Sequence, residues 1–143
     1  SEMREMSPSS LGAYPIATAG TSTLIFFSDI DADTVKEQVR YYIQGQQIIR
    51  GVIEPVGTPP VYNVGSMVTR TVISDIGNGT STPLFQYYDT GYAGTTTPLA
   101  SPVNISSIRL IQINALVDSV SSRGNSQFTV TSQVTPRNLK DNL

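Results

Sequence analysis

The sequence predicts an α+β fold in which an antiparallel sheet of four to seven strands packs against the end of an N-terminal helix. Several short segments alternate apolar and polar residues and are rich in valine, isoleucine, threonine and aromatic residues, a pattern typical of half-buried strands. A helix stub is expected over residues 1–10, where Pro8 limits its length. The chain is therefore expected to be mostly sheet.

Length and composition indicate a single globular domain. The 143 residues have room for one domain with one core. With 38% hydrophobic and 14% charged residues, the chain is neither disordered nor membrane-embedded. We expect a helix stub and connecting loop over residues 1–22, one β-rich globular domain over residues 23–139 and a C-terminal tail over residues 140–143.

The charge and the missing residue types exclude several functions. The net charge is −2 and the only lysines are Lys36 and Lys140, so no basic stripe is present and we expect no nucleic-acid binding. Cysteine and histidine are absent, which removes the usual zinc ligands, the thiol nucleophiles and the commonest general base. We therefore expect no enzyme. Serine, threonine, asparagine and glutamine dominate the polar positions and favour an extracellular setting.

The first strands are expected to form a three-stranded antiparallel meander. Residues 23–28 are an apolar run of strand formers, which ends at the acidic turn 29–33. Residues 37–43 form the second strand, and residues 47–52 return after a turn in which Gly45 tolerates positive φ.

The middle of the chain is less regular. Residues 54–60 are a loop rich in proline and glycine. Over residues 66–76, apolar residues recur every four positions from Val68 to Ile76, as in a helix, whereas the β-branched residues favour a strand; both readings stay open. Residues 83–88 form a short aromatic strand.

The last third predicts a long hairpin. Residues 108–117 and 127–135 each carry apolar side chains at alternate positions. Residues 118–126 between them are polar and contain Gly124, so we expect a loop there.

Three blocks of the sequence carry a resemblance to a known family. The first has an apolar strand, a D-x-D-x-D turn, a V-R-Y strand and an arginine on the return strand, over residues 24–33, 39–42 and 49–51. The second reads P-L-F-Q-Y-Y-D, over residues 83–89. The third ends in V-T-P-R-N-L, over residues 108–118 and 128–139. In this order the blocks resemble pseudopilin J of type II secretion systems and related minor type IV pilins.

The resemblance implies a pilin-like fold and a structural function. A minor pilin or pseudopilin acts in the assembly and initiation of a type IV filament or secretion pseudopilus through contacts with other major and minor subunits. The family's hydrophobic N-terminal helix, which anchors the precursor in the inner membrane, has no counterpart in these residues, and we expect it to precede Ser1. The resemblance places the protein at the cell surface or in the periplasm.

The acidic turn is a candidate metal site. Asp29, Asp31 and Asp33 alternate, with Glu37 nearby, as at the start of a calcium loop, where several carboxylate oxygens converge on one hard cation. The turn lacks the glycine and the glutamate that an EF-hand has at its sixth and twelfth positions. The other reading is a solvated turn in which the aspartates accept local backbone hydrogen bonds.

An alternative function is a calcium-dependent or carbohydrate-binding module of an extracellular adhesin. It is favoured by the acidic turn, by the Ser/Thr-rich composition and by a set of tyrosines that could form a binding platform, Tyr41, Tyr42, Tyr87, Tyr88 and Tyr92. In each adjacent pair of tyrosines, one ring is expected to point into the core and one outward.

Three short motifs are interpreted as turns. Asp89-Thr90-Gly91 matches the triplet of aspartic proteases, but the hydrophobic segment ending in glycine that such an enzyme needs does not follow it. Asn78 and Asn104 fit the N-glycosylation sequon, and both are expected to serve as turn residues.

Overall fold

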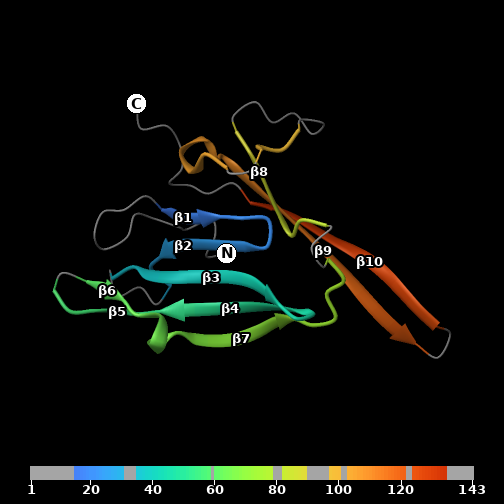
Figure 1. The fold of residues 1–143 in the computed structure, drawn as a ribbon, viewed down its shortest axis with the longest axis horizontal. Coiled ribbons are helices and arrows are strands. Elements are labelled where there is room, and N and C mark those ends of the chain that lie inside the picture. The colour runs from blue at the N-terminus through green and yellow to red at the C-terminus, as the bar shows by residue number, and fades with distance from the viewer. Residues whose placement is uncertain are drawn as a thin grey trace.

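The computed structural model describes residues 15–30, 35–58, 60–78, 82–89, 97–100, 103–121 and 124–134. Within these residues the chain forms ten strands in three antiparallel sheets (Figure 1). The largest sheet has the order β1 (Ile16–Ala19), β2 (Thr23–Ser28), β3 (Glu37–Gln44), β4 (Gln47–Ile53) and β7 (Val68–Ile73). The second has the order β10 (Gly124–Val134), β9 (Leu110–Ser121) and β8 (Phe85–Tyr88).

The remaining elements are short. A small hairpin pairs β5 (Pro55–Val56) with β6 (Val61–Tyr62). Two single 3₁₀ turns, η1 (Val64–Ser66) and η2 (Ile105–Ser107), are each capped by an asparagine side chain. These turns are the only helical elements among the described residues.

The predicted α+β class, with a sheet packed on a helix, is wrong. The described chain is built from antiparallel sheets and contains no α-helix in those ranges. The second sheet, in place of a helix, covers the apolar face of the first, which is one of the ways a sheet can bury that face. The helix stub expected over residues 1–10 lies outside the described residues.

The predicted meander is confirmed. Strands β2, β3 and β4 pair in sequence order, with Leu24 opposite Tyr41 and Val39 opposite Val52. The tight turn between β3 and β4 contains Gly45 at φ 61°, a backbone conformation that costs other L-residues energy.

The segment that fitted both a helix and a strand is a strand. β7 pairs with β4, and its β-branched residues suit the pleated surface of a sheet edge. The pairing is irregular at one point: Ile48 lies opposite Ile73 and Ile49 opposite Thr71, so Val72 is an extra residue on β7. Such a bulge changes the direction of the strand locally.

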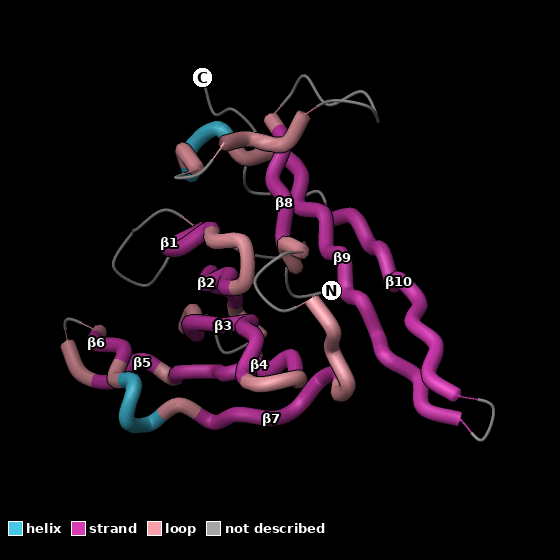
Figure 2. The backbone as a smooth tube through the Cα atoms, turned by 45° about the vertical axis from the view of Figure 1, so that its right-hand side comes forward, coloured by secondary structure: helices cyan, strands magenta, loops and turns pink. Residues whose placement is uncertain are grey.

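The C-terminal hairpin is confirmed but is longer than expected. Residues 118–121 and 124–126, predicted as loop, continue the ladder of β9 and β10. The prediction failed because a ladder between two strands is held by backbone hydrogen bonds and does not need apolar side chains. The hairpin therefore projects past the first sheet (Figures 1 and 2).

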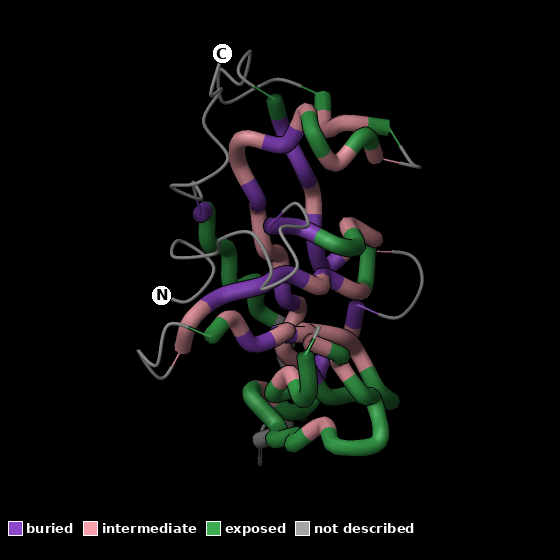
Figure 3. The backbone as a smooth tube through the Cα atoms, turned by 90° about the vertical axis from the view of Figure 1, so that its left-hand side faces the viewer, coloured by how far each residue is buried: buried purple, intermediate pink, exposed green. Residues whose placement is uncertain are grey.

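The core lies between the two larger sheets. Leu24, Phe26 and Val39 of the first sheet are fully buried, as are Ile111 and Ala115 of β9. Figure 3 shows the backbone coloured by burial, with the buried parts in purple. Together these residues join the sheets into one cluster.

The opposite face of the first sheet is partly covered by the small hairpin. The ring of Tyr62 on β6 lies 5.2 Å from that of Phe27, and its hydroxyl donates a hydrogen bond to the Lys36 carbonyl at 2.7 Å. Both faces of the sheet therefore bury aromatic side chains.

Candidate functional site

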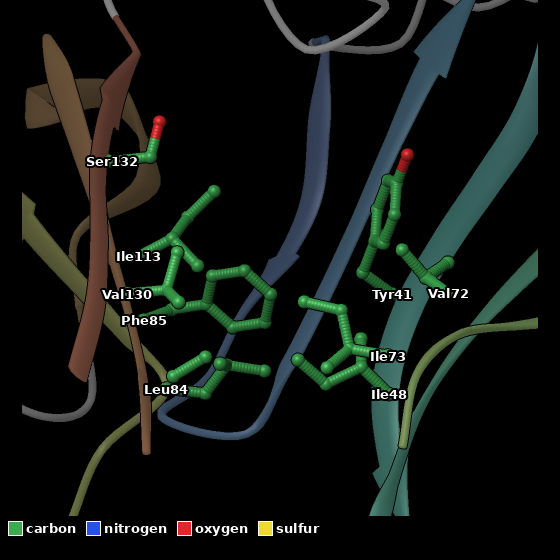
Figure 4. A pocket seen from close by; sticks show the side chains of 10 residues that line it. Tyr41, Ile48, Val72, Ile73, Leu84, Phe85, Ile113, Val130 and Ser132 are labelled. Atoms are coloured by element: carbon green, nitrogen blue, oxygen red, sulfur yellow. The ribbon is translucent and has the colours of Figure 1, made fainter. Parts of the chain in front are cut away.

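An apolar cleft opens between the two larger sheets. One wall comes from β3, β4 and β7 and consists of Tyr41, Ile48, Val72 and Ile73. The other wall comes from β8, β9, β10 and the residue before β8, and consists of Leu84, Phe85, Ile113, Ala115, Val130 and Ser132. Figure 4 shows the side chains of the two walls pointing toward each other across a space of about 200 Å³.

The lining of the cleft contains no carboxylate, amine or guanidinium group. Its polar groups are the hydroxyls of Tyr41 and Ser132. The Tyr41 ring is fixed by stacking on Phe26, with ring centroids 6.1 Å apart and planes at 8°. The cleft can therefore hold an apolar side chain or an aliphatic group.

Exposed apolar side chains continue the cleft at its rim. On β7, Val72 is 44% exposed. On β10, Phe128 is 52% exposed and Val130 is 43% exposed. Val130 shares a face with Ala115 and Phe128 shares a face with Val117, so the two β10 side chains lie on the cleft side of the hairpin. The cleft and its rim form a surface that a partner could bury.

The cleft exists because a short connection joins the two sheets. After β7 the chain crosses at residues 75–78, with Asp75 at φ 62°. Ile76 donates its N–H to the Gln46 carbonyl at 2.8 Å, on the first sheet. Gly77 donates to the Leu116 carbonyl at 2.7 Å, on β9. Two adjacent residues thus bond to the β3–β4 turn of the first sheet and to β9 of the second.

Asn78 completes this connection with its side chain. It is fully buried, and its amide nitrogen donates to the Asn114 carbonyl at 2.8 Å and the Thr82 carbonyl at 3.1 Å. Its side-chain oxygen accepts the Leu116 N–H at 2.8 Å. The sequence predicted Asn78 to be a turn residue. Its location between two apolar segments was the only sequence signal of its burial.

A second anchor holds β8 to the first sheet. The N–H groups of Leu84 and Phe85 donate to the Thr21 carbonyl at 2.8 and 3.0 Å. The buried Tyr87 hydroxyl donates to the Gly20 carbonyl at 2.8 Å. Burial disfavours the phenolate and raises the pKa of Tyr87 well above its ordinary value of 10.0.

The acidic turn lies away from the cleft and is only partly described. Asp29 is half-buried at the end of β2, and Asp31 and Asp33 lie outside the described residues. Glu37, at the start of β3, is fully buried, and its Oε1 accepts the Ile30 N–H at 3.2 Å. In the described part of the chain, no group of three acidic, histidine or cysteine side chains is positioned to hold a metal ion.

The structure does not assemble the tyrosines into one platform. Tyr87 and Tyr88 are both buried, so the expectation of one inward and one outward ring was wrong for this pair. The Tyr88 hydroxyl donates to the Gln112 side chain at 2.9 Å, which allows its burial. Tyr41 and Tyr42 are partly buried, and Tyr92 lies outside the described residues.

The remaining motifs are the triplet that begins at Asp89 and the sequon at Asn104. Asp89 is exposed after β8, and Thr90 and Gly91 lie outside the described residues. Asn104 accepts the Ser106 N–H at 3.2 Å and so caps the turn η2.

Comparisons with known proteins identify no relative. The chain matches no family model, no curated protein and no solved structure. In the described ranges, no helix has the length and apolar character needed to cross a membrane.

Replacing Asn78→Ala should lower the free energy of unfolding by about 2–4 kcal/mol, because buried backbone groups of Asn114 and Leu116 lose their partners. The matched control is Asn104→Ala, which removes an exposed cap and should cost about 1 kcal/mol or less. Urea unfolding curves followed by circular dichroism measure both. Equal losses in the two variants would contradict the structural role of Asn78.

Tyr87 should make stability decrease at alkaline pH. Because its pKa is raised in the folded state, the unfolded chain loses the proton first, so the contribution of Tyr87 is full below about pH 10 and is lost as pH rises above it. Above about pH 10, one such buried phenol should lower the free energy of unfolding by about 1.4 kcal/mol per pH unit.

The variant Tyr87→Phe should be less stable than the wild type at neutral pH, because the Gly20 carbonyl loses its donor. Its stability should nevertheless fall less steeply between about pH 10 and pH 11. Urea unfolding across this range tests the difference in slope, and parallel curves would contradict it.

Proposed function

We propose that this chain is the globular head of a minor pilin or pseudopilin, a structural subunit of a type IV filament or type II secretion pseudopilus. It acts by contact with neighbouring major and minor subunits and catalyses no reaction. Its place is at the cell surface or in the periplasm, and a hydrophobic helix preceding Ser1 anchors the precursor in the inner membrane.

The three sequence blocks that resemble this family support the proposal. They correspond to consecutive units of the fold: the meander β2–β3–β4, strand β8, and the hairpin β9–β10. These units supply most of the lining of the cleft. The resemblance is therefore carried by the parts of the chain that form both walls of one surface.

The uncovered apolar cleft carries the proposal. A space lined by apolar side chains continues into exposed Val72 on one rim and Phe128 and Val130 on the other. Exposed apolar surface of this kind marks a contact with another molecule. A structural subunit buries such a surface on assembly.

Adding a charge at the cleft should prevent incorporation into filaments. In cells whose only copy is Val72→Glu, we expect about tenfold or more less subunit in the sheared filament fraction, because assembly would bury a carboxylate against apolar side chains. The control is Thr71→Glu, which adds the same charge to the adjacent exposed residue outside the cleft. Quantitative immunoblotting measures the subunit in the filament fraction.

The folded state of both variants is checked by circular dichroism of the purified domain. Immunogold labelling of filaments should detect the wild-type subunit and the Thr71→Glu variant. Absence of the wild-type protein from filaments, or full incorporation of Val72→Glu, would contradict the proposed function.

A second candidate function, calcium binding by an extracellular adhesin module, is favoured by the position of Glu37. Glu37 is the ninth residue counted from Asp29, a position that contributes to cation binding in calcium loops. Its buried carboxylate bonds to the backbone of the turn through Ile30. We propose that Asp29, Asp31, Asp33 and Glu37 bind one calcium ion.

Calcium at millimolar concentration should then raise the melting temperature of the protein, and excess chelator should reverse the rise, because a ligand that binds the folded state stabilises it. Glu37→Gln and Asp29→Asn should abolish the rise. Asp75→Asn, a distant exposed acid at positive φ that asparagine tolerates, should retain it. A melting temperature that does not respond to calcium in the wild type would rule out this site.

A further inference from the structure

Strand β10 forms a long edge of the second sheet. The order of this sheet is β10, β9, β8, so β9 lies on one side of β10 and no described strand lies on the other. Figure 2 shows the β9–β10 hairpin extending beyond the rest of the molecule, with β10 on its outer side. A strand at the edge of a sheet can present outward-facing backbone donors and acceptors.

The hydrogen bonds of β9 show which β10 residues direct their backbone outward. Asn114 donates to the Leu84 carbonyl, Leu116 bonds to Gly77 and Asn78, and Asp118 donates to the Asp75 carbonyl. Even-numbered residues of β9 therefore direct their backbone groups away from β10, and odd-numbered ones direct theirs toward it. The β10 partners of those odd-numbered residues include Phe128, Val130 and Ser132.

The residues between these partners face outward. In an antiparallel pair, alternate residues bond to the same neighbour, so the backbone N–H and C=O of Thr129 and Thr131 point away from β9. Both side chains are exposed. Thr129 and Thr131 therefore offer an extended backbone edge to an incoming strand.

The composition of β10 favours pairing with the same strand of a second copy of the chain. Natural edge strands are usually protected by charged residues, proline or bulges. From Gly124 to Val134, β10 has no charged residue and no proline, and its pairing with β9 is regular throughout. The edge of the first sheet differs, because β7 carries Arg70 and a bulge at Val72.

We propose that two copies of this chain associate by antiparallel pairing of β10 with β10, with the two-fold axis at Thr129. In this register the outward backbone of Thr129 pairs with that of Thr129 in the second copy. No like charges face each other, because neither strand carries any. The product is one continuous sheet of two hairpins.

The apolar side chains select this register. With Thr129 on the axis, Phe128 of each copy lies opposite Val130 of the other, at positions that do not exchange hydrogen bonds across the new interface. Side chains are closest at such positions, and aromatic residues opposite β-branched ones stabilise a strand pair. Phe128 and Val130 are the exposed apolar residues of β10 in the described chain. Placing Val130 on the axis would instead set Phe128 against Ser132.

The association goes beyond the proposed filament function and does not depend on it. It uses the backbone edge of β10, whereas the filament contact uses the cleft and is tested on β7. Pairing along one strand edge buries little surface, so we expect a dimer whose population depends on concentration.

Sedimentation velocity of the purified 143-residue chain over a range of concentrations tests the proposal. The wild type should dimerise. Thr129→Pro removes the outward N–H at the axis, and proline is tolerated at an edge position whose N–H faces solvent. It should weaken dimerisation roughly tenfold or more. The control Thr129→Val keeps the backbone N–H and should dimerise like the wild type.

A charge exchange tests the two-fold axis. Thr129→Lys and Thr129→Glu should each be monomeric at low salt, because each places like charges opposite one another, and an equimolar mixture should dimerise. Circular dichroism shows that each variant is folded, and the charge pair keeps the test decisive if Thr129→Pro does not fold. A monomeric wild type, a dimer unaffected at Thr129, or a mixture that stays monomeric would overturn the proposal.

Discussion

The connection between the two larger sheets is the constraint on which the rest of the structure depends. Over residues 75–78 the chain bonds to Gln46 on one sheet and to Leu116 and Asn114 on the other. Because this connection forms hydrogen bonds to both sheets, it fixes the distance between them where it crosses. Close packing of Leu24, Phe26 and Ile111 also fixes that distance nearby. The last of these bonds along the hairpin joins Asp118 of β9 to the Asp75 carbonyl, past the cleft-lining residues Ile113 and Ala115. The cleft therefore lies within the part of the hairpin that the connection ties to the first sheet.

The cleft follows from a mismatch in length between the sheets. β9 and β10 run well beyond the pairing with β8, which ends opposite Ile113, and beyond the first sheet. Ala115 is fully buried near this limit, whereas Val130, its partner across the ladder, is 43% exposed. Apolar side chains are thus retained on one face of the hairpin where no described element covers them, and burial by another molecule would lower their free energy.

Much of the strand order could be predicted from the sequence. The strands β2, β3 and β4 carry apolar residues, and the turn between β3 and β4 can be recognised from Gly45 itself. The class was mispredicted because a periodic pattern shows which face of a strand is buried but not what covers it. The role of Asn78 was missed for a related reason: its partners, Thr82, Asn114 and Leu116, include two that are distant in sequence. The cleft is composed of residues from six segments of the chain, and no local pattern brings them together.

The geometry of β10 keeps two kinds of contact separate on one strand. Phe128, Val130 and Ser132 turn their side chains toward the cleft and their backbone toward β9, whereas Thr129 and Thr131 turn their backbone away from β9. A partner in the cleft would therefore contact side chains, and a partner at the edge would bond to main chain. Pairing at the edge would place a second apolar strand beside Phe128 and Val130 without covering that face. A strand that protrudes past its own core can thus contact one partner through its face and another through its edge.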